Sequence, residues 1–306
     1  MSLIQPPLLS DGDGIHLVAT ARHVSEDLVE QTCAIIETAG FRPLTGKNLQ
    51  NRSHQFAGTD EERAEDLQAA LGHPHAHAIL AMRGGYGSQR VLDLVDLTGL
   101  SSSPKWVCGF SDITALHGSL QRIGVQSLHC AMPSVFSTTE QEAVDGLFNT
   151  LKQGPSDLSW STNSPQMDTS GMLVGGNMSV LHTMIGTNSF PEMDGSILFL
   201  EDLDEMLYHI DRMMVHFKRA GLLDRLNAIV LGGLTDMRDN TMIHGFSSND
   251  PFGSSAVEIV ERIARQSDVP CVVGLPAGHV PRNLPLVLGA EVRLQVVDGT
   301  ASMSYT

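Results

Sequence analysis

Short apolar runs alternate with segments of helical spacing along residues 15–130. IHLVA at 15–19 and AILAM at 78–82 are apolar throughout, which predicts strands buried on both faces. At 25–39 the apolar residues share one side, with Ser25 in the N-cap position and Gly40 in the stop position. This alternation predicts a parallel sheet with helices on both faces. The predicted strands are 15–19, 78–82, 106–110 and 124–130, and the predicted helices are 25–39, 61–71, 88–95 and 113–123.

The pattern changes after residue 151. Residues 152–171 are rich in Ser, Pro, Thr and Gly, which is typical of a linker between domains. We therefore expect an N-terminal domain at 1–151 and a C-terminal domain at 172–306. In the second half we predict helices at 175–185, 208–220 and 255–265, strands at 197–200, 228–231 and 271–274, a polar loop at 235–254 and an antiparallel hairpin within 287–304.

The composition is that of a globular protein. The chain has 306 residues, of which 42% are hydrophobic and 18% charged, so it can bury a core. A formal charge of −16 argues against nucleic acid or an anionic membrane as partner, because both bind basic surfaces. The sequence starts without the features of a secretion signal and has no apolar run of about 18 residues. We therefore expect a cytoplasmic protein.

The sequence offers little support for a metal or a cofactor. Its four cysteines are far apart and form no C-x-x-C pair, which argues against a disulfide framework or a zinc site. HPHAH at 73–77 has three histidines, but no neighbouring carboxylate or cysteine completes a set of ligands. We interpret this tract as a loop, and we expect neither a metal nor a cofactor.

Two segments that follow predicted strands carry candidate chemistry. Ser111, in GFSD, lies at a strand-to-helix turn, where a hydroxyl points outward and the helix N-terminus favours an oxyanion. The G-x-S-x-G pattern is not met, because Ile113 takes its last position, and Ser111 alone also fits a helix N-cap. RGGYG at 83–87 could donate backbone N–H groups to a ligand, although this segment alone favours a plain tight turn.

A carboxylate and a histidine follow two further predicted strands. Glu201 comes directly after ILFL, but Asp202, Asp204 and Glu205 lie close behind, so the residues alone leave the choice of acid open. His279 follows a strand on a loop rich in Gly and Pro, where it could act as a general base. Ligands gather at the carboxyl ends of parallel strands, and the order Ser, Glu, His recurs in acyl-transfer enzymes. Together these residues therefore predict a catalytic triad.

Taken in order, six segments resemble the LD-carboxypeptidase family of serine peptidases, which includes muramoyl-tetrapeptide carboxypeptidases and microcin-immunity peptidases. They cover most of the chain, and their common order makes the resemblance specific. The segments are RGGYGSQRVLDLVD (83–96), GFSDITALH (109–117), GGNMSVLHTMIGT (175–187), ILFLEDLDEMLYHIDRMMVHFKRAGLL (197–223), AIVLGGL (228–234) and GLPAGHVPRNLPLVLGAEVRL (274–294).

The resemblance implies a role for each candidate residue. Ser111 matches the nucleophile, Glu201 the triad acid with Glu205 as a competitor, and His279 the base. The backbone N–H groups of Gly85 and Asp112 match the oxyanion hole. The family fold has a doubly wound, mostly parallel N-terminal α/β domain and a C-terminal α+β domain, with the active site in the cleft between them. Family members are commonly homodimers.

The family also implies a substrate and leaves alternatives. The expected activity is hydrolysis of an L,D-peptide bond that releases the terminal D-alanine of a murein tetrapeptide during cell-wall recycling. Arg83 or Arg212 could bind its free carboxylate. Other readings are a peptidase that inactivates peptide-nucleotide antibiotics and a binding protein without catalysis. The chain departs from the family at Ala19-Thr20-Ala21-Arg22, where an Ala-Pro-Ser-like turn is usual, and at Val280, where Gly is common.

Overall fold

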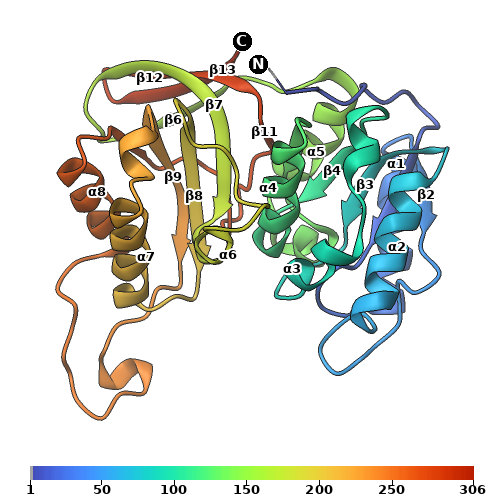
Figure 1. Cartoon of the computed structure of the whole chain (residues 1–306), viewed down its shortest axis with the longest axis horizontal. Helices are drawn as coiled ribbons and strands as arrows, with labels where there is room; N and C mark the ends of the chain where they lie inside the picture. The colour runs from blue at the N-terminus through green and yellow to red at the C-terminus, as the bar shows by residue number, and fades with distance from the viewer. Residues whose placement is uncertain (1–2) are drawn as a thin grey trace.

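The first of two sheets forms one half of the molecule (Figure 1). Its strands in the computed structural model, which describes residues 3–306, are β1 (Gly14–Val18), β2 (Arg42–Thr45), β3 (Ala76–Ala81), β4 (Trp106–Gly109), β5 (Ser127–His129) and β11 (Leu286–Leu288). Their order is β11-β5-β4-β3-β1-β2. All neighbouring pairs are parallel except that of β11 with β5, which is antiparallel.

Helices cover both faces of this sheet. On one face lie α1 (Glu26–Thr38) and α5 (Gln141–Gln153), and on the other lie α2 (Asp60–Gly72), α3 (Ser88–Val91) and α4 (Thr114–Arg122). Successive strand residues point to opposite faces, so Leu17 and Leu80 join one core cluster while Val18 and Ile79 join the other. This is the doubly wound arrangement that the alternating pattern predicted.

The second sheet is mixed. Its strands are β6 (Leu158–Ser161), β7 (Met167–Asn177), β8 (Ile197–Leu203), β9 (Ala228–Thr235), β10 (Cys271–Val273), β12 (Glu291–Val297) and β13 (Thr300–Tyr305). Their order is β10-β9-β8-β7-β12-β13-β6. The pairs from β10 to β7 are parallel, and those from β7 to β6 are antiparallel. Helices α6 (Met178–Met184), α7 (Leu207–Arg219) and α8 (Ala256–Gln266) pack on one face of the parallel part.

Most predicted elements are confirmed. Ser25 caps α1 by accepting a hydrogen bond from the backbone N–H of Leu28. The hairpin within 287–304 is present as β12 and β13. The polar loop at 235–254 holds only the end of β9 and one short 3₁₀ turn, and it extends away from the sheets beside α7 (Figure 1). The 3₁₀ turns are Leu92–Leu94, Thr98–Ser101, Ser111–Ile113, Pro133–Thr138, Leu223–Arg225 and Met242–His244.

The stretch 152–171, which we predicted as a linker, contributes strand residues to the second sheet. It contains all of β6 and the first residues of β7. Because this stretch is rich in Ser and Thr, its composition did not indicate strands. Trp160 is nevertheless buried among residues of the same sheet. The boundaries 1–151 and 172–306 stay a prediction, and one strand crosses them, because β11 pairs with β5 in the first sheet.

Further differences separate the prediction from the structure. The predicted helix at 175–185 begins only at Met178, because Gly175 to Asn177 still belong to β7. Strand β2 and helix α5 were not predicted at all.

No helix within residues 3–306 has both the length and the apolar character that crossing a bilayer requires.

Candidate active site

A cavity of about 470 Å³ lies where the two sheets face each other. The loops after β1, β3, β4 and β5 form one wall, and the ends of β7 and β8 with the loop after β10 form the other. The cavity therefore lies at the carboxyl ends of strands from both sheets, as the sequence predicted. Its lining residues are Arg22, Arg83, Gly84, Gly85, Phe110, Ser111, Met132, Ser134, Val135, Asn177, Ser179, Val180, Asp202, Leu203, Asp204 and His279.

Ser111 stands on the turn that follows β4. Its φ is +60°, a left-handed backbone conformation that is rare for a residue other than glycine. Ser111 is the first residue of a 3₁₀ turn whose N-cap is Phe110, and the N-cap of α4 is Ile113, so the alternative that Ser111 is an ordinary helix N-cap is wrong. The turn is tight, because a Cβ at Gly109 would lie 2.9 Å from Cγ1 of Ile113. A strained serine at the end of a central strand is the geometry of a presented nucleophile.

A buried histidine holds the strand end beneath this turn. Nε2 of His117 donates to the carbonyl oxygen of Gly109 at 2.9 Å, and Nδ1 lies 2.8 Å from Oγ of Ser127. Burial lowers the pKa of His117 to about 4, so the ring is neutral at pH 7. A neutral ring with Nε2 protonated fits both contacts, since Nδ1 then accepts from the Ser127 hydroxyl. His117 lies in the segment GFSDITALH, but no sequence pattern indicated this role.

Glu201 is buried and forms a pair with the partly buried His279. Oε2 of Glu201 accepts hydrogen bonds from Nδ1 of His279 at 2.6 Å and from its backbone N–H at 3.1 Å. Glu205, the competing acid, instead pairs with His209 one turn further along the chain, at 2.7 Å. The contacts therefore favour Glu201 as the partner of His279. Within residues 3–306 no hydrogen bond joins Ser111 to the His279 ring, although the ring of Phe110 lies 4.7 Å from it, centroid to centroid.

The charge of Glu201 sets the protonation of His279. Burial lowers the pKa of His279, but the charge and hydrogen bond of Glu201, together with the charge of Asp202, raise it by more. The pKa of His279 therefore lies above its ordinary value. Because Nδ1 is bound to Glu201, the other ring nitrogen, Nε2, is the one that can take a proton from a nucleophile.

Neighbouring backbone contacts fix the loop that carries His279. The N–H of Gly278 donates to Oδ1 of Asn283 at 2.7 Å, and Oγ1 of Thr235 donates to the carbonyl oxygen of His279 at 2.7 Å. Gly278 has φ +98°, and a Cβ there would lie 2.7 Å from Oε2 of Glu201. Only glycine therefore allows the loop to approach the carboxylate this closely.

The glycine turn at 83–87 lies against the serine. A Cβ at Gly84 would lie 3.4 Å from Oγ of Ser111, and Gly85, with φ +110°, lies directly over the Arg22 side chain. The carboxylate of Asp112 accepts a hydrogen bond from the backbone N–H of Ser88 at 2.8 Å, which ties the two turns together. The backbone N–H groups of Gly85 and Asp112 thus belong to two turns that meet beside Ser111.

Charged groups line opposite walls of the cavity. Arg22 and Arg83 lie on the wall of the first sheet, and Asp202 and Asp204 on the wall of the second. The side chain of Arg83 donates to the carbonyl oxygen of His23 at 3.3 Å. Arg212, the other predicted carboxylate ligand, lies outside the lining and stacks over the ring of Tyr208, 5.2 Å from its centroid. Arg22 also lines the cavity, although no sequence pattern marked it as a candidate ligand.

Asp202 is buried next to Glu201. It accepts hydrogen bonds from Nδ2 of Asn177 at 2.8 Å and from the backbone N–H of Ser179 at 2.9 Å, which fixes the start of α6 at the cavity wall. Burial, reinforced by the charge of Glu201, raises the pKa of Asp202 to about 7. Near pH 7 the second wall therefore carries a charge that varies with pH.

Comparison with known proteins now adds to this geometry. Residues 15–130 match the LD-carboxypeptidase N-terminal domain, and residues 170–294 match the LD-carboxypeptidase C-terminal domain. The chain belongs to the LD-carboxypeptidase family. The membership confirms the resemblance seen in the sequence and the expectation that the protein is a peptidase.

Individual members of the family resemble the whole chain. The murein tetrapeptide carboxypeptidase of Pseudomonas aeruginosa is 30% identical, over 88% of this chain and 89% of its own. The crystal structure of muramoyltetrapeptide carboxypeptidase from Oxalobacter formigenes superimposes with a TM-score of 0.86 at 25% identity, over 95% of this chain and 98% of that one. The microcin C7 self-immunity protein MccF superimposes with a TM-score of 0.84 at 18% identity, over 100% and 99%, and so shares the fold.

Proposed function

We propose that this protein is a serine LD-carboxypeptidase that removes the terminal D-alanine from murein tetrapeptides, with Ser111, Glu201 and His279 as its triad. The observation that carries the proposal is the pairing of the buried Glu201 with His279, which lines the same cavity as a serine held at φ +60°. Two relatives with full-length similarity are named for cleavage of this substrate class, which supports the same substrate here.

The reaction we propose is acyl transfer through Ser111. Nε2 of His279 takes the hydroxyl proton as Oγ of Ser111 bonds to the carbonyl carbon of the scissile peptide. His279 then gives this proton to the leaving nitrogen of D-alanine, and the C–N bond breaks. A water molecule, deprotonated by the same ring, releases the acyl group from Ser111. Glu201 holds the ring in the required tautomer and stabilises its charged form.

The oxyanion that forms in this reaction requires donors beside Ser111. We assign this role to the backbone N–H groups of Gly85 and Asp112, because Asp112 directly follows Ser111 in its turn and the turn that carries Gly85 contacts it. Such donors stabilise the charge that develops on the carbonyl oxygen, and losing one typically slows turnover by about 100-fold or more.

A carboxypeptidase must also recognise a free carboxylate. We assign this role to Arg83 together with Arg22, because both line the cavity on the side of the glycine turn. The leaving residue places its carboxylate only a few bonds from the scissile carbonyl, so its ligand has to lie next to the oxyanion donors. Arg22 meets this requirement, since its side chain packs directly against Gly85.

The location and assembly of the protein belong to the same proposal. Acting on murein fragments that are recycled inside the cell requires a cytoplasmic location, and the family resemblance implies a homodimer. Cell fractionation and light scattering of the purified protein test these two statements separately from the activity.

The decisive experiment uses mass spectrometry of a free murein tetrapeptide incubated with wild-type protein and with Ser111→Ala. We expect the loss of one alanine with wild type only. A tetrapeptide whose terminal carboxylate is amidated serves as the matched control and is expected to react much more slowly. Equal loss with both proteins would contradict the assignment of Ser111. No loss with either would favour a peptide-nucleotide substrate, and an absence of fluorophosphonate labelling as well would favour a binding protein.

A further inference from the structure

A buried arginine on α2 lies beneath the loops of the candidate active site. The side chain of Arg63 is fully buried, and the residue is only 2% exposed. A cation in such a place is costly unless it is paired and hydrogen-bonded. Arg63 does not line the cavity, so its burial is not explained by contact with a substrate.

The guanidinium of Arg63 joins two loops to helix α2. Its Nη1 donates to the carbonyl oxygen of Thr20 and, at 3.0 Å, to that of Gly87. Its Nη2 donates to the carboxylate of Asp60, and its guanidinium lies 4.8 Å from the centroid of the Phe56 ring. Thr20 belongs to the loop that carries Arg22, and Gly87 ends the turn that carries Gly85.

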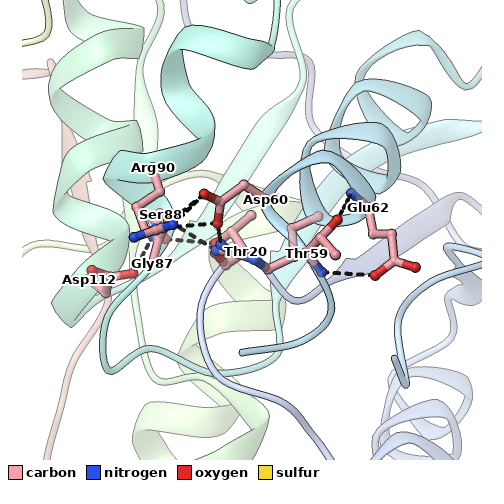
Figure 2. Close-up of polar contacts among 9 residues, drawn as sticks. Thr20, Thr59, Asp60, Glu62, Gly87, Ser88, Arg90 and Asp112 are labelled. Carbon is pink, nitrogen blue, oxygen red and sulfur yellow. Dashed lines mark hydrogen bonds and ion pairs between the residues drawn. The ribbon is translucent and has the colours of Figure 1, made fainter. Parts of the chain in front are cut away.

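The loop that carries Ser111 and Asp112 is hydrogen-bonded to the end of the same glycine turn (Figure 2). The hydroxyls of Thr20 and Ser88 lie 2.8 Å apart, and the backbone N–H of Ser88 donates to the carboxylate of Asp112 at 2.8 Å. Asp112 directly follows Ser111 in the chain. Gly87 has φ +146°, and a Cβ there would lie 2.6 Å from Nη1 of Arg63, so the glycine is needed for the contact.

We propose that Arg63 is a positioning residue, which fixes the carbonyl of Gly87 and thereby holds the Gly85 backbone N–H in position beside Ser111. The inference rests on the proposed function for its chemistry, but not for its geometry. Oxyanion donors act only when they are aimed before the reaction begins, and a peptide plane that can rotate loses that advantage. Arg63 binds the Gly87 carbonyl at the end of the turn 83–87, and Asp112 binds the N–H of Ser88, so the turn is fixed next to Ser111.

The test compares Arg63→Met and Arg63→Lys with a matched control, Arg90→Met. Arg90 also pairs with Asp60, at 2.6 Å, but it contacts neither of the two carbonyl groups that Arg63 binds (Figure 2). Two measurements are made on each full-length variant: the rate of labelling by a fluorophosphonate, whose phosphonyl oxygen needs the oxyanion donors, and amide hydrogen exchange of the peptide 83–88. Lysine keeps the charge but lacks the fork that spans both carbonyls, so it serves if Arg63→Met does not fold.

We expect the fluorophosphonate to label Arg63→Lys about tenfold more slowly than wild type. Amide hydrogen exchange should be faster at 83–88 and unchanged from wild type elsewhere. We expect Arg90→Met to stay within about threefold of wild type in labelling. Unchanged labelling and unchanged hydrogen exchange in the Arg63 variants would overturn the inference. Faster exchange over the whole chain would also overturn it, because the effect would then not be local. Slower labelling without a change of exchange at 83–88 would overturn it as well. If wild type does not label at all while exchange at 83–88 still rises, the proposed function fails and the positioning role stands.

Discussion

Glu201 is completely buried, and within residues 3–306 its Oε1 has no hydrogen-bond partner. Its other oxygen takes both hydrogen bonds from His279. A buried carboxylate is costly unless a positive charge or donors compensate it, so the pair is most stable when the imidazole is charged. That is the state a general base reaches after it takes the proton of Ser111.

The pair predicts a specific pH dependence. His279 has to be neutral to accept a proton, so kcat/KM should rise with pH and reach half its plateau above about pH 6.5, because the pKa of His279 is raised. In Glu201→Gln the lowering effect of burial remains while the charge of Glu201 is lost. We therefore expect a midpoint at lower pH and a plateau about 100- to 10,000-fold lower. Profiles of kcat/KM against pH for both proteins make the comparison, and equal midpoints would contradict the role of Glu201.

The elements that carry the proposed triad meet at a close contact between the two sheets. The backbone N–H of Asn177, at the end of β7, donates to Oγ1 of Thr114, the first residue of α4, at 2.9 Å. Gly176 has φ +136°, and a Cβ there would lie 2.5 Å from the same oxygen. Ser111 precedes α4 and Glu201 pairs with Asn177 across β7 and β8, so this contact sets the spacing of the two walls.

Gly176→Ala should therefore push the walls apart. We expect the free energy of unfolding to fall by about 2–4 kcal/mol, from steric clash and backbone strain together, and labelling of Ser111 to slow. Gly186→Ala is the matched control, because Gly186 also has a positive φ, +86°, but an added Cβ meets nothing within 4 Å. That variant should lose only about 1–2 kcal/mol. Urea titration measures the free energy of unfolding of both variants. Equal losses would mean that the structure relaxes enough to avoid the clash with Thr114.

At the scale of the whole molecule, the end of the chain connects the two sheets. Strand β11 pairs with β5 of the first sheet, and β12 and β13, which follow it, pair within the second. The backbone N–H of Val287 donates to the hydroxyl of Tyr305 at 3.1 Å, which links β11 to the last strand. Unfolding of one sheet therefore removes contacts from the other.

The two tryptophans allow this coupling to be measured. Trp106 lies in β4 of the first sheet and Trp160 in β6 of the second, and both are buried. Trp106→Phe and Trp160→Phe each leave one fluorescent reporter, on a different sheet. We expect each variant's fluorescence transition in urea to coincide with its transition by circular dichroism, as two-state unfolding requires. Separate midpoints would show that the sheets unfold independently despite β11.

Local sequence determined much of the fold and the members of the candidate site. Apolar runs and helical spacing are short-range properties, so most strands and helices of the first sheet, and the positions of Ser111 and His279 after strands, could be read directly. Glu201 was predicted to follow a strand at 197–200, whereas it lies inside β8, which continues to Leu203. Glycines at 84–87 and at 278 marked places where backbone approaches another group, because few other residues tolerate those conformations.

Tertiary structure alone decided which side chains meet. Glu201 and His279 are 78 positions apart, and the choice of Glu201 over Glu205 came only from which of the two reaches the histidine loop. Arg63 looked like one charged residue of a polar helix, yet it binds a loop 43 positions away. Residues 152–171 looked like a linker because composition does not show which strand a polar segment will pair with. Periodicity reports which face of an element is buried, whereas contacts between elements depend on long-range packing that no local pattern records.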